Sequence, residues 1–227
     1  MDFIDPLIEQ YALDYTENES SLLNNLSRQT YLNILQPRML SGHLQGRLLS
    51  TFSKALNPQK ILEIGTYTGY SALCLAEGLN KNGQIYTIDI NKELEEFAQN
   101  YFNASPYKNK IHFLIGDAAE LIPEMKHTWD IVFIDADKEN YSLYFDLVID
   151  KVRKGGWIIA DNVLWSGKVT KPTLNNDLET ASIKAFNKKV NSDKRVSNVL
   201  IPVRDGIMLM IKTVSYTHLR AHETDRY

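Results

Sequence analysis

From residue 60 onward, short apolar runs alternate with amphipathic stretches, and this alternation restricts the fold more than any other feature of the chain. Runs rich in Ile, Val and Leu and bounded by Gly, Asp or Asn are typical of buried parallel strands. Strands are predicted at 60–64, 84–88, 111–115, 131–134 and 157–160. Helices are predicted between them, at 70–79, 92–102, 118–125 and 141–152. Such a pattern indicates an α/β, doubly wound sheet.

The two ends of the chain depart from this alternation. Residues 1–57 show helical spacing of apolar side chains and predict a helical N-terminal extension. Near the other end, a helix at 179–190 precedes strands at 196–201 and 207–212, which an Asp205-Gly206 turn would join as a hairpin. The expected architecture is a Rossmann-like, doubly wound seven-stranded sheet that is mostly parallel, with an antiparallel C-terminal hairpin.

The last fourteen residues, 214–227, carry no strand or helix period. They resemble translated adapter sequence, so we interpret them as a non-native tail, with a natural disordered tail as the alternative. The expected fold is therefore a single domain over residues 1–213.

Composition excludes several kinds of protein. The 227 residues include 25 basic and 28 acidic side chains, for a net charge of −3, whereas proteins that mainly grip nucleic-acid backbones are usually more basic. Cys74 is the single cysteine, which excludes an internal disulfide framework and a cysteine-rich zinc site. The chain contains no apolar run of about 18 residues and starts with an acidic stretch. We expect a soluble, cytoplasmic protein with no membrane segment.

The first predicted strand runs into a glycine loop, Glu63-Ile64-Gly65-Thr66-Tyr67-Thr68-Gly69-Tyr70-Ser71. Glycines at a strand exit let a ligand approach the backbone, and the following helix N-terminus offers free N–H groups. The spacing Gly-x-x-x-Gly differs from the dinucleotide fingerprint and disfavours a nicotinamide oxidoreductase. Asp89 ends the second strand, where an acid can accept both ribose hydroxyls. Asp117-Ala118 follow the third strand, in a place suited to an adenine edge.

Two further strand ends carry oxygen ligands. Asp135 follows the fourth predicted strand and Asp161-Asn162 follow the fifth. Because the carboxyl ends of adjacent parallel strands open on one crevice, these side chains are expected to converge. Two carboxylates and an amide oxygen suit Mg²⁺, with Ca²⁺ or Mn²⁺ as alternatives. Any one Asp after a strand is more often a loop cap than a ligand, and a non-catalytic module that only binds its nucleotide-like cofactor is the rival hypothesis.

These motifs together resemble a known family. The glycine loop is similar to the first motif of class I S-adenosylmethionine-dependent methyltransferases, and more closely to that of the cation-dependent O-methyltransferases of the caffeoyl-CoA and catechol type, including bacterial-type members. The similarity spans about residues 39–213. It implies transfer of a methyl group to a hydroxyl of a small catechol-like (vicinal dihydroxy) phenolic acceptor, a divalent cation and a homodimer. A branch of the same family that methylates hydroxyuridine in tRNA is the alternative.

The resemblance also assigns site residues. Cofactor contacts are implied for Met39, Ser41, Glu63, Gly65, Thr66, Tyr67, Ser71, Asp89, Asp117, Ala118 and Asp135. Cation ligands are implied at Asp135, Asp161 and Asn162. Catalytic roles are implied for Lys138, as the general base, and for Asp135, and Trp165 and Ser166 are expected to border the acceptor pocket. Gln45 and Ser166 stand where plant members carry Glu and Asn, which leaves the acceptor open.

Overall fold

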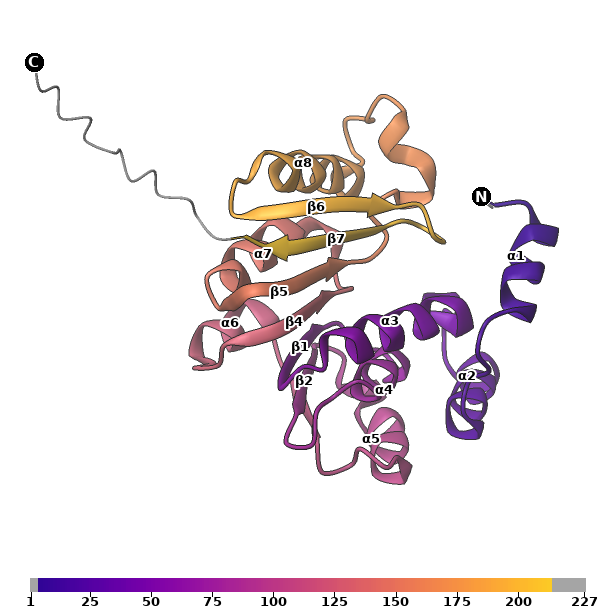
Figure 1. Cartoon of the computed structure of the whole chain (residues 1–227). Coiled ribbons are helices and arrows are strands. Elements are labelled where there is room, and N and C mark those ends of the chain that lie inside the picture. The colour runs from indigo at the N-terminus through magenta and orange to yellow at the C-terminus, as the bar shows by residue number, and fades with distance from the viewer. Residues whose placement is uncertain (1–3, 214–227) are drawn as a thin grey trace, which may run out of the picture.

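The protein is described by a computed structural model that covers residues 4–213. Within these residues seven strands form one mixed sheet in the order β3-β2-β1-β4-β5-β7-β6 (Figure 1). The strands are β1 (Lys60–Ile64), β2 (Gln84–Asp89), β3 (Ile111–Ile115), β4 (Trp129–Ile134), β5 (Val152–Ala160), β6 (Val196–Ile201) and β7 (Ile207–Lys212). The first five are parallel, and β7 runs antiparallel to both β5 and β6. The predicted sheet is confirmed. The predicted tail, 214–227, lies outside the described residues.

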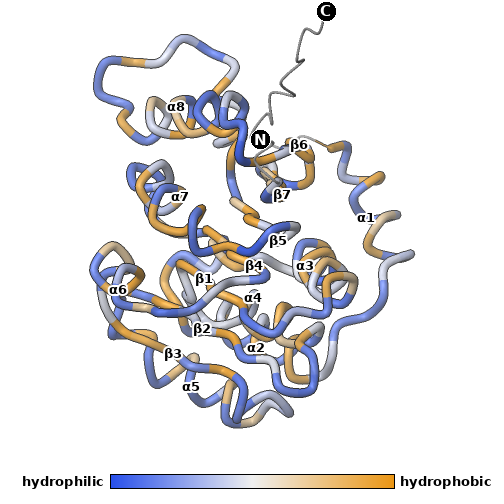
Figure 2. The backbone as a smooth tube through the Cα atoms, turned by 60° about the vertical axis from the view of Figure 1, so that its left-hand side comes forward, coloured by the Kyte–Doolittle hydropathy of each residue, from blue (hydrophilic) through white to orange (hydrophobic). Residues whose placement is uncertain are grey.

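Helices cover both faces of the sheet, as the doubly wound prediction requires. One face packs against α6 (Ala118–Glu124), α7 (Tyr141–Ile149) and α8 (Leu178–Ser192). The other packs against α3 (Gly42–Leu56), α4 (Tyr70–Ala76) and α5 (Glu95–Ala104), with α2 (Ser21–Asn33) beyond them. Successive strand residues point to opposite faces, so Ile61 and Leu62 belong to different cores. Because both faces are covered, the central strands are largely apolar, with Glu63 and Thr87 as buried polar exceptions. Figure 2 shows the hydrophobic stretches of the strands between the helical layers.

Several predicted boundaries near β5 are wrong. The helix expected to reach residue 152 ends at Ile149, and β5 starts at Val152 rather than at Trp157. Val152 pairs with Trp129, and a register shift follows before Ile131 pairs with Trp157. Pairing with β4 thus extends the strand to Val152, through Gly155 and Gly156. The helix α4 is also shorter than predicted, since it ends at Ala76.

Short helical segments complete the described chain. They are α1 (Pro6–Asp14) and the 3₁₀ turns η1 (Pro37–Met39), η2 (Lys92–Leu94), η3 (Lys138–Asn140) and η4 (Trp165–Thr170). Ser20 caps α2 by accepting a hydrogen bond from the Leu23 amide, at the start that the sequence predicted. By contrast, α1 buries none of its residues. In the described part of the chain, no helix has the length and apolar character needed to cross a membrane.

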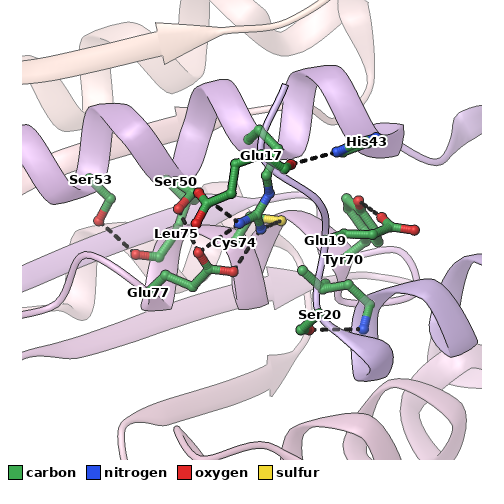
Figure 3. Close-up of polar contacts among 12 residues, drawn as sticks. Glu17, Glu19, Ser20, His43, Ser50, Ser53, Tyr70, Cys74, Leu75 and Glu77 are labelled. Atoms are coloured by element: carbon green, nitrogen blue, oxygen red, sulfur yellow. Dashed lines mark hydrogen bonds and ion pairs between the residues drawn. The ribbon is translucent and has the colours of Figure 1, made fainter. Parts of the chain in front are cut away.

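A polar network attaches the N-terminal extension to the sheet helices (Figure 3). Arg47 on α3 donates two hydrogen bonds to Glu77, at 2.9 and 2.7 Å. The link between α1 and α2 joins this region because Glu19 accepts a hydrogen bond from the Tyr70 hydroxyl at 2.5 Å. The Glu17 carbonyl lies 2.8 Å from Nε2 of His43. The link between α1 and α2 is therefore held on α3 and α4, and α3 is held on the end of α4.

Candidate functional site

The glycine loop after β1 brings two strand ends into contact. Gly65 has a φ of 98°, and its amide donates to the Ile88 carbonyl at 2.9 Å. A Cβ atom at this position would lie only 1.9 Å from the carbonyl oxygen of Asp135. Only glycine fits between the ends of β1 and β4, so this residue lets the two strand ends approach each other closely.

Asp89, at the end of β2, fixes the shape of the glycine loop. Its Oδ2 accepts hydrogen bonds from the amides of Thr66 and Tyr67, at 3.0 and 2.7 Å. Its Oδ1 accepts from the Asn91 amide at 2.8 Å. A carboxylate offers about four lone-pair positions, so Asp89 retains capacity to accept hydroxyl groups.

Glu63 is the most constrained acid of the site. It is fully buried on β1 and accepts a hydrogen bond from Thr87. Burial raises its pKa to about 8, against the opposing effect of the Ser71 and Thr87 hydroxyls. Its Oε1 makes no hydrogen bond among residues 4–213. A buried oxygen without a donor is costly, and it marks a position where a ligand donor fits.

The N-terminal segment reaches the glycine loop through Tyr67. Its hydroxyl donates to the carbonyls of Leu35 and Gln36, at 3.4 and 3.2 Å. The η1 turn that follows carries Met39, which is exposed, and leads to Ser41, which is buried. The segment at 35–36 therefore lies beside the glycine loop, and the cofactor contacts implied for Met39 and Ser41 stay a prediction.

The two residues expected beside an adenine lie at the start of α6. Asp117 caps this helix, since its Oδ1 accepts from the Ala119 amide at 2.7 Å. Ala118 is buried in the core under the sheet. The cap explains the Gly-Asp-Ala sequence locally and leaves one Asp117 oxygen for another donor.

Lys138 lies over the end of β4 and is almost completely buried. Its Nζ donates to Asp135 Oδ1 at 3.1 Å and to the Tyr141 hydroxyl at 2.6 Å. The Tyr141 hydroxyl in turn donates to the Asp161 carbonyl at 3.1 Å. Lys138 is thus oriented by side chains from both sides, and Tyr141 is a site residue that the sequence reasoning missed. The sequence signal that could have identified Tyr141 is its position three residues after Lys138, since residues with this spacing lie on one face of a helix.

Asp161 and Asp135 converge as predicted from the ends of β5 and β4. Asp161 Oδ2 accepts from Nε2 of Gln45 at 2.6 Å, and Oδ1 accepts from the Asn162 amide at 2.7 Å. Burial and the neighbouring Asp135 carboxylate raise the pKa of Asp161. Two close carboxylates repel one another unless a cation or a proton lies between them.

The residues expected to border the acceptor follow β5 in a loop with positive φ angles. Trp165 and Ser166 both have positive φ, at 47° and 51°. The Trp165 ring centroid lies 5.9 Å from Lys138 Nζ, and its buried Nε1 has no hydrogen-bond partner in the described chain. Trp165 therefore belongs next to Lys138, and its indole N–H is another unmatched donor.

Three further side chains with reactive groups, Asp137, Cys74 and His43, each have their own surroundings. Asp137 accepts hydrogen bonds from Tyr144 and Asn140 at 2.5 and 2.6 Å. Cys74 is fully buried, and burial raises its thiol pKa to about 12, so it is a core residue as expected. His43 lines a polar hollow of about 540 Å³ along α2, away from the strand ends.

Known proteins are similar to this chain both in sequence and in fold. A family model described as O-methyltransferase matches residues 13–213. A probable caffeoyl-CoA O-methyltransferase 2 from Dictyostelium discoideum is 33% identical over 210 residues, which cover 90% of this chain and 91% of that protein. Caffeoyl-CoA O-methyltransferase 5 from Nicotiana tabacum is 35% identical over 73% of each chain. An O-methyltransferase from Bacillus cereus, solved with S-adenosylhomocysteine, has a TM-score of 0.82 at 27% identity and covers 91% of this chain and 97% of its own.

Proposed function

Because the chain belongs to the O-methyltransferase family, we propose that it transfers a methyl group from S-adenosylmethionine to a hydroxyl of a small, catechol-like acceptor, with the help of a divalent cation. The observation that carries the proposal is the convergence at the strand ends. Lys138 Nζ lies 3.1 Å from Asp135 Oδ1. On its other side it donates to the Tyr141 hydroxyl, which itself donates to the Asp161 carbonyl.

The strand ends of β1 and β2 fit the cofactor. Glu63 Oε1 is buried without a donor, which suits the amino group of a methionine moiety. Asp89 holds the glycine loop and retains lone pairs for ribose hydroxyls. We assign Met39, Ser41, Gly65, Thr66, Tyr67 and Ser71 to the same part of the site, with Asp117 and Ala118 at the adenine. When bound, S-adenosylmethionine supplies an electrophilic methyl group on sulfonium.

The donor set at β4 and β5 fits a hard divalent cation. Asp135, Asp161 and Asn162 present only oxygen ligands, which favours Mg²⁺, with Ca²⁺ or Mn²⁺ as alternatives. Burial, and next to it the Asp135 carboxylate, raise the pKa of Asp161, and a bound cation would oppose both effects by favouring the ionised carboxylate. When bound, the cation stabilises the phenolate form of a hydroxyl whose pKa is otherwise about 10.

Lys138 is the residue that moves the proton. Asp135 and Tyr141 hold its Nζ in one orientation, because both accept hydrogen bonds from it. As a neutral amine, which has two N–H donors and one lone pair, Lys138 would take the proton of the acceptor hydroxyl. That oxygen forms its bond to the methyl group as the bond between methyl and sulfur breaks, and S-adenosylhomocysteine leaves. Burial of Lys138 keeps bulk water from competing for this proton, and fixed orientation supplies part of the rate.

An aromatic acceptor is favoured by the side chain that borders Lys138. Trp165 presents a large planar surface to the site, and aromatic rings stack favourably on such surfaces. Ser166 follows it and is exposed, so it can contact the acceptor. A tRNA acceptor is the competing hypothesis within the same family.

The experiment is a methyl-transfer assay with labelled S-adenosylmethionine and Mg²⁺. The acceptors are catechol, a catechol monomethyl ether, a caffeoyl thioester and tRNA that lacks modified uridine. Transfer to the vicinal diols but not to the monomethyl ether supports the proposal, and Lys138→Ala serves as the inactive control. Transfer to tRNA alone would show that the acceptor is tRNA and not a catechol. A protein that does not bind S-adenosylhomocysteine would refute the proposed function.

Two further properties stay proposals. We propose a homodimer because α1 buries none of its own side chains and exposes Leu7, Ile8 and Tyr11. A cytoplasmic location is proposed from the single cysteine, whose thiol is buried.

A further inference from the structure

The turn between β6 and β7 contacts both segments that border the proposed site. It spans residues 202–206 and closes through a hydrogen bond from the Gly206 amide to the Val203 carbonyl at 2.9 Å. Arg204 and Gly206 have positive φ, at 51° and 84°. From the sequence this turn was expected only to join two strands.

On one side the turn holds the loop that follows β5. The Val163 amide donates to the Gly206 carbonyl at 3.1 Å, and the Leu164 amide donates to the Asp205 carbonyl at 2.9 Å. The Ser166 amide donates to Asp205 Oδ1 at 2.6 Å. A Cβ atom at Gly206 would come within 2.5 Å of Leu164, so the loop lies directly against the turn.

The loop needs this support because its own backbone is unfavourable. Asn162, Trp165 and Ser166 have φ of 57°, 47° and 51°, and Gly167 has 74°. Residues other than glycine rarely adopt this region, and they persist there only when surrounding bonds hold them. The position of Trp165 beside Lys138 therefore depends on the turn.

On its other side the turn reaches the N-terminal segment. Arg204 Nη1 donates to the Leu40 carbonyl at 3.2 Å, between the proposed cofactor residues Met39 and Ser41. Gly42 has a φ of 75°, and a Cβ atom there would lie 3.1 Å from Arg204 Nη1. Glycine at position 42 thus gives the guanidinium room beside this segment.

We propose that the β6–β7 turn is a positioning element for methyl transfer, in which Asp205 fixes the acceptor loop and Arg204 fixes the cofactor-side segment. What the two segments bind rests on the proposed function. Both residues act through backbone groups of those segments, so they are positioning residues. Each should affect a different ligand.

The first arm of the test compares Asp205→Ala with Asp205→Asn. Alanine removes the acceptor of the Ser166 amide, whereas asparagine keeps an oxygen at the same place. We expect Asp205→Ala to accelerate hydrogen exchange of the amides at 163–166. The acceptor KM should rise about tenfold, because a tenfold change corresponds to the loss of one strong hydrogen bond. The Kd for S-adenosylhomocysteine should stay within about twofold, and Asp205→Asn should restore most of both values.

The second arm uses Arg204→Asn, since asparagine tolerates positive φ but cannot reach Leu40. We expect faster exchange of the amides at 39–42 and a Kd for S-adenosylhomocysteine raised about five- to tenfold, with the acceptor KM near that of the wild type. Arg28→Asn, an exposed arginine on α2, is the matched control and should leave all of these values unchanged.

Three results would overturn the proposal. Exchange that is unchanged in both loops shows that the turn does not hold them. A common loss of Tm with parallel changes in Kd and KM shows that the turn only stabilises the fold. An acceptor KM of Asp205→Ala that stays near the wild-type value shows that the side-chain oxygen at position 205 is not needed. If the wild type binds no S-adenosylhomocysteine or methylates no acceptor, the proposed function fails, and the exchange data still decide the role of the turn.

Discussion

Gln45 and Asp161 are 116 residues apart in the chain, yet Gln45 Nε2 donates a hydrogen bond to Asp161 Oδ2 at 2.6 Å inside the protein. Both side chains are buried. The contact joins α3, part of the N-terminal extension, to the strand end that carries the proposed cation ligands. A buried carboxylate without this donor would bear an additional desolvation penalty.

Substitution of Gln45 should therefore lower the stability of the cation-free protein, and a glutamate there should also increase the stabilisation by added Mg²⁺. Gln45→Ala is expected to lower the unfolding free energy of the cation-free protein by about 1–3 kcal/mol, since a bond to a carboxylate is lost. Gln45→Glu adds a second acid next to Asp161, so it should destabilise the cation-free protein and increase the gain in Tm on addition of Mg²⁺. Thermal melts with EDTA and with Mg²⁺ measure both effects. Equal Mg²⁺ shifts in the wild type and Gln45→Glu would contradict this.

Lys138→Ala should reduce turnover about 10²–10⁴-fold, the range for loss of a general base. Affinity for S-adenosylhomocysteine, measured by calorimetry, should stay near that of the wild type because Lys138 faces the acceptor side. Tyr141→Phe removes one of the two groups that orient Nζ and should lower kcat about tenfold with little change in KM. If Lys138→Ala abolishes cofactor binding, the lysine is structural.

Removal of divalent cation should abolish turnover and leave cofactor binding intact. The expected reason is that Asp135, Asp161 and Asn162 lie on the acceptor side of the strand ends, where the cation would orient a vicinal diol. Activity is measured after treatment with EDTA and again after addition of Mg²⁺, Mn²⁺ or Ca²⁺. Asp161→Asn is the companion variant and should weaken the response to added cation. Full activity in metal-free buffer would show that the acids have another role.

Glu63 should make the cofactor-free protein less stable as the pH rises. Its pKa is about 8 when folded and 4.5 when exposed, so between these values the folded protein holds a proton that the unfolded chain has lost. The contribution of Glu63 to the free energy of unfolding is fully present below about pH 4.5 and is lost as the pH rises through 8. Glu63→Gln keeps the shape without the titration.

Urea unfolding at several pH values tests this contribution. The wild type should lose on the order of 1–3 kcal/mol relative to Glu63→Gln between pH 5 and 8. Parallel stability curves for the two proteins would mean that the carboxyl is ionised in the folded state.

The exposed face of α1 should determine the oligomeric state. Ile8 and Tyr11 are 62% and 63% exposed, so replacing either by Asp leaves the core of a single chain intact. We expect Ile8→Asp and Tyr11→Asp to convert a dimer to a monomer in sedimentation velocity experiments, because a charge in an apolar interface is costly. Glu9→Gln, on the same helix, is the control. A wild-type protein that is monomeric at micromolar concentration would refute the dimer.

The sequence was most informative where local chemistry and periodicity agree. The runs at 60–64 and 111–115 are strands with the predicted bounds, because short β-branched and apolar runs bounded by turn residues are typical of strands. Asp135 and Asp161 were expected to converge, since the ends of neighbouring parallel strands meet at one edge. The start of β5 was missed because pairing of Val152 with Trp129 depends on another strand.

What the chain determined by itself is the order of strands and helices, the glycine loop and the oxygen ligands at strand ends, because each depends on residues near one another in sequence. The tertiary structure alone decided which side chains orient those groups. Gln45 crosses from α3 to Asp161, Tyr141 reaches the Asp161 carbonyl, and Asp205 holds the Ser166 amide. These contacts join distant segments through single hydrogen bonds, whose geometry follows from how the helices pack on the sheet and leaves no periodic pattern in the sequence.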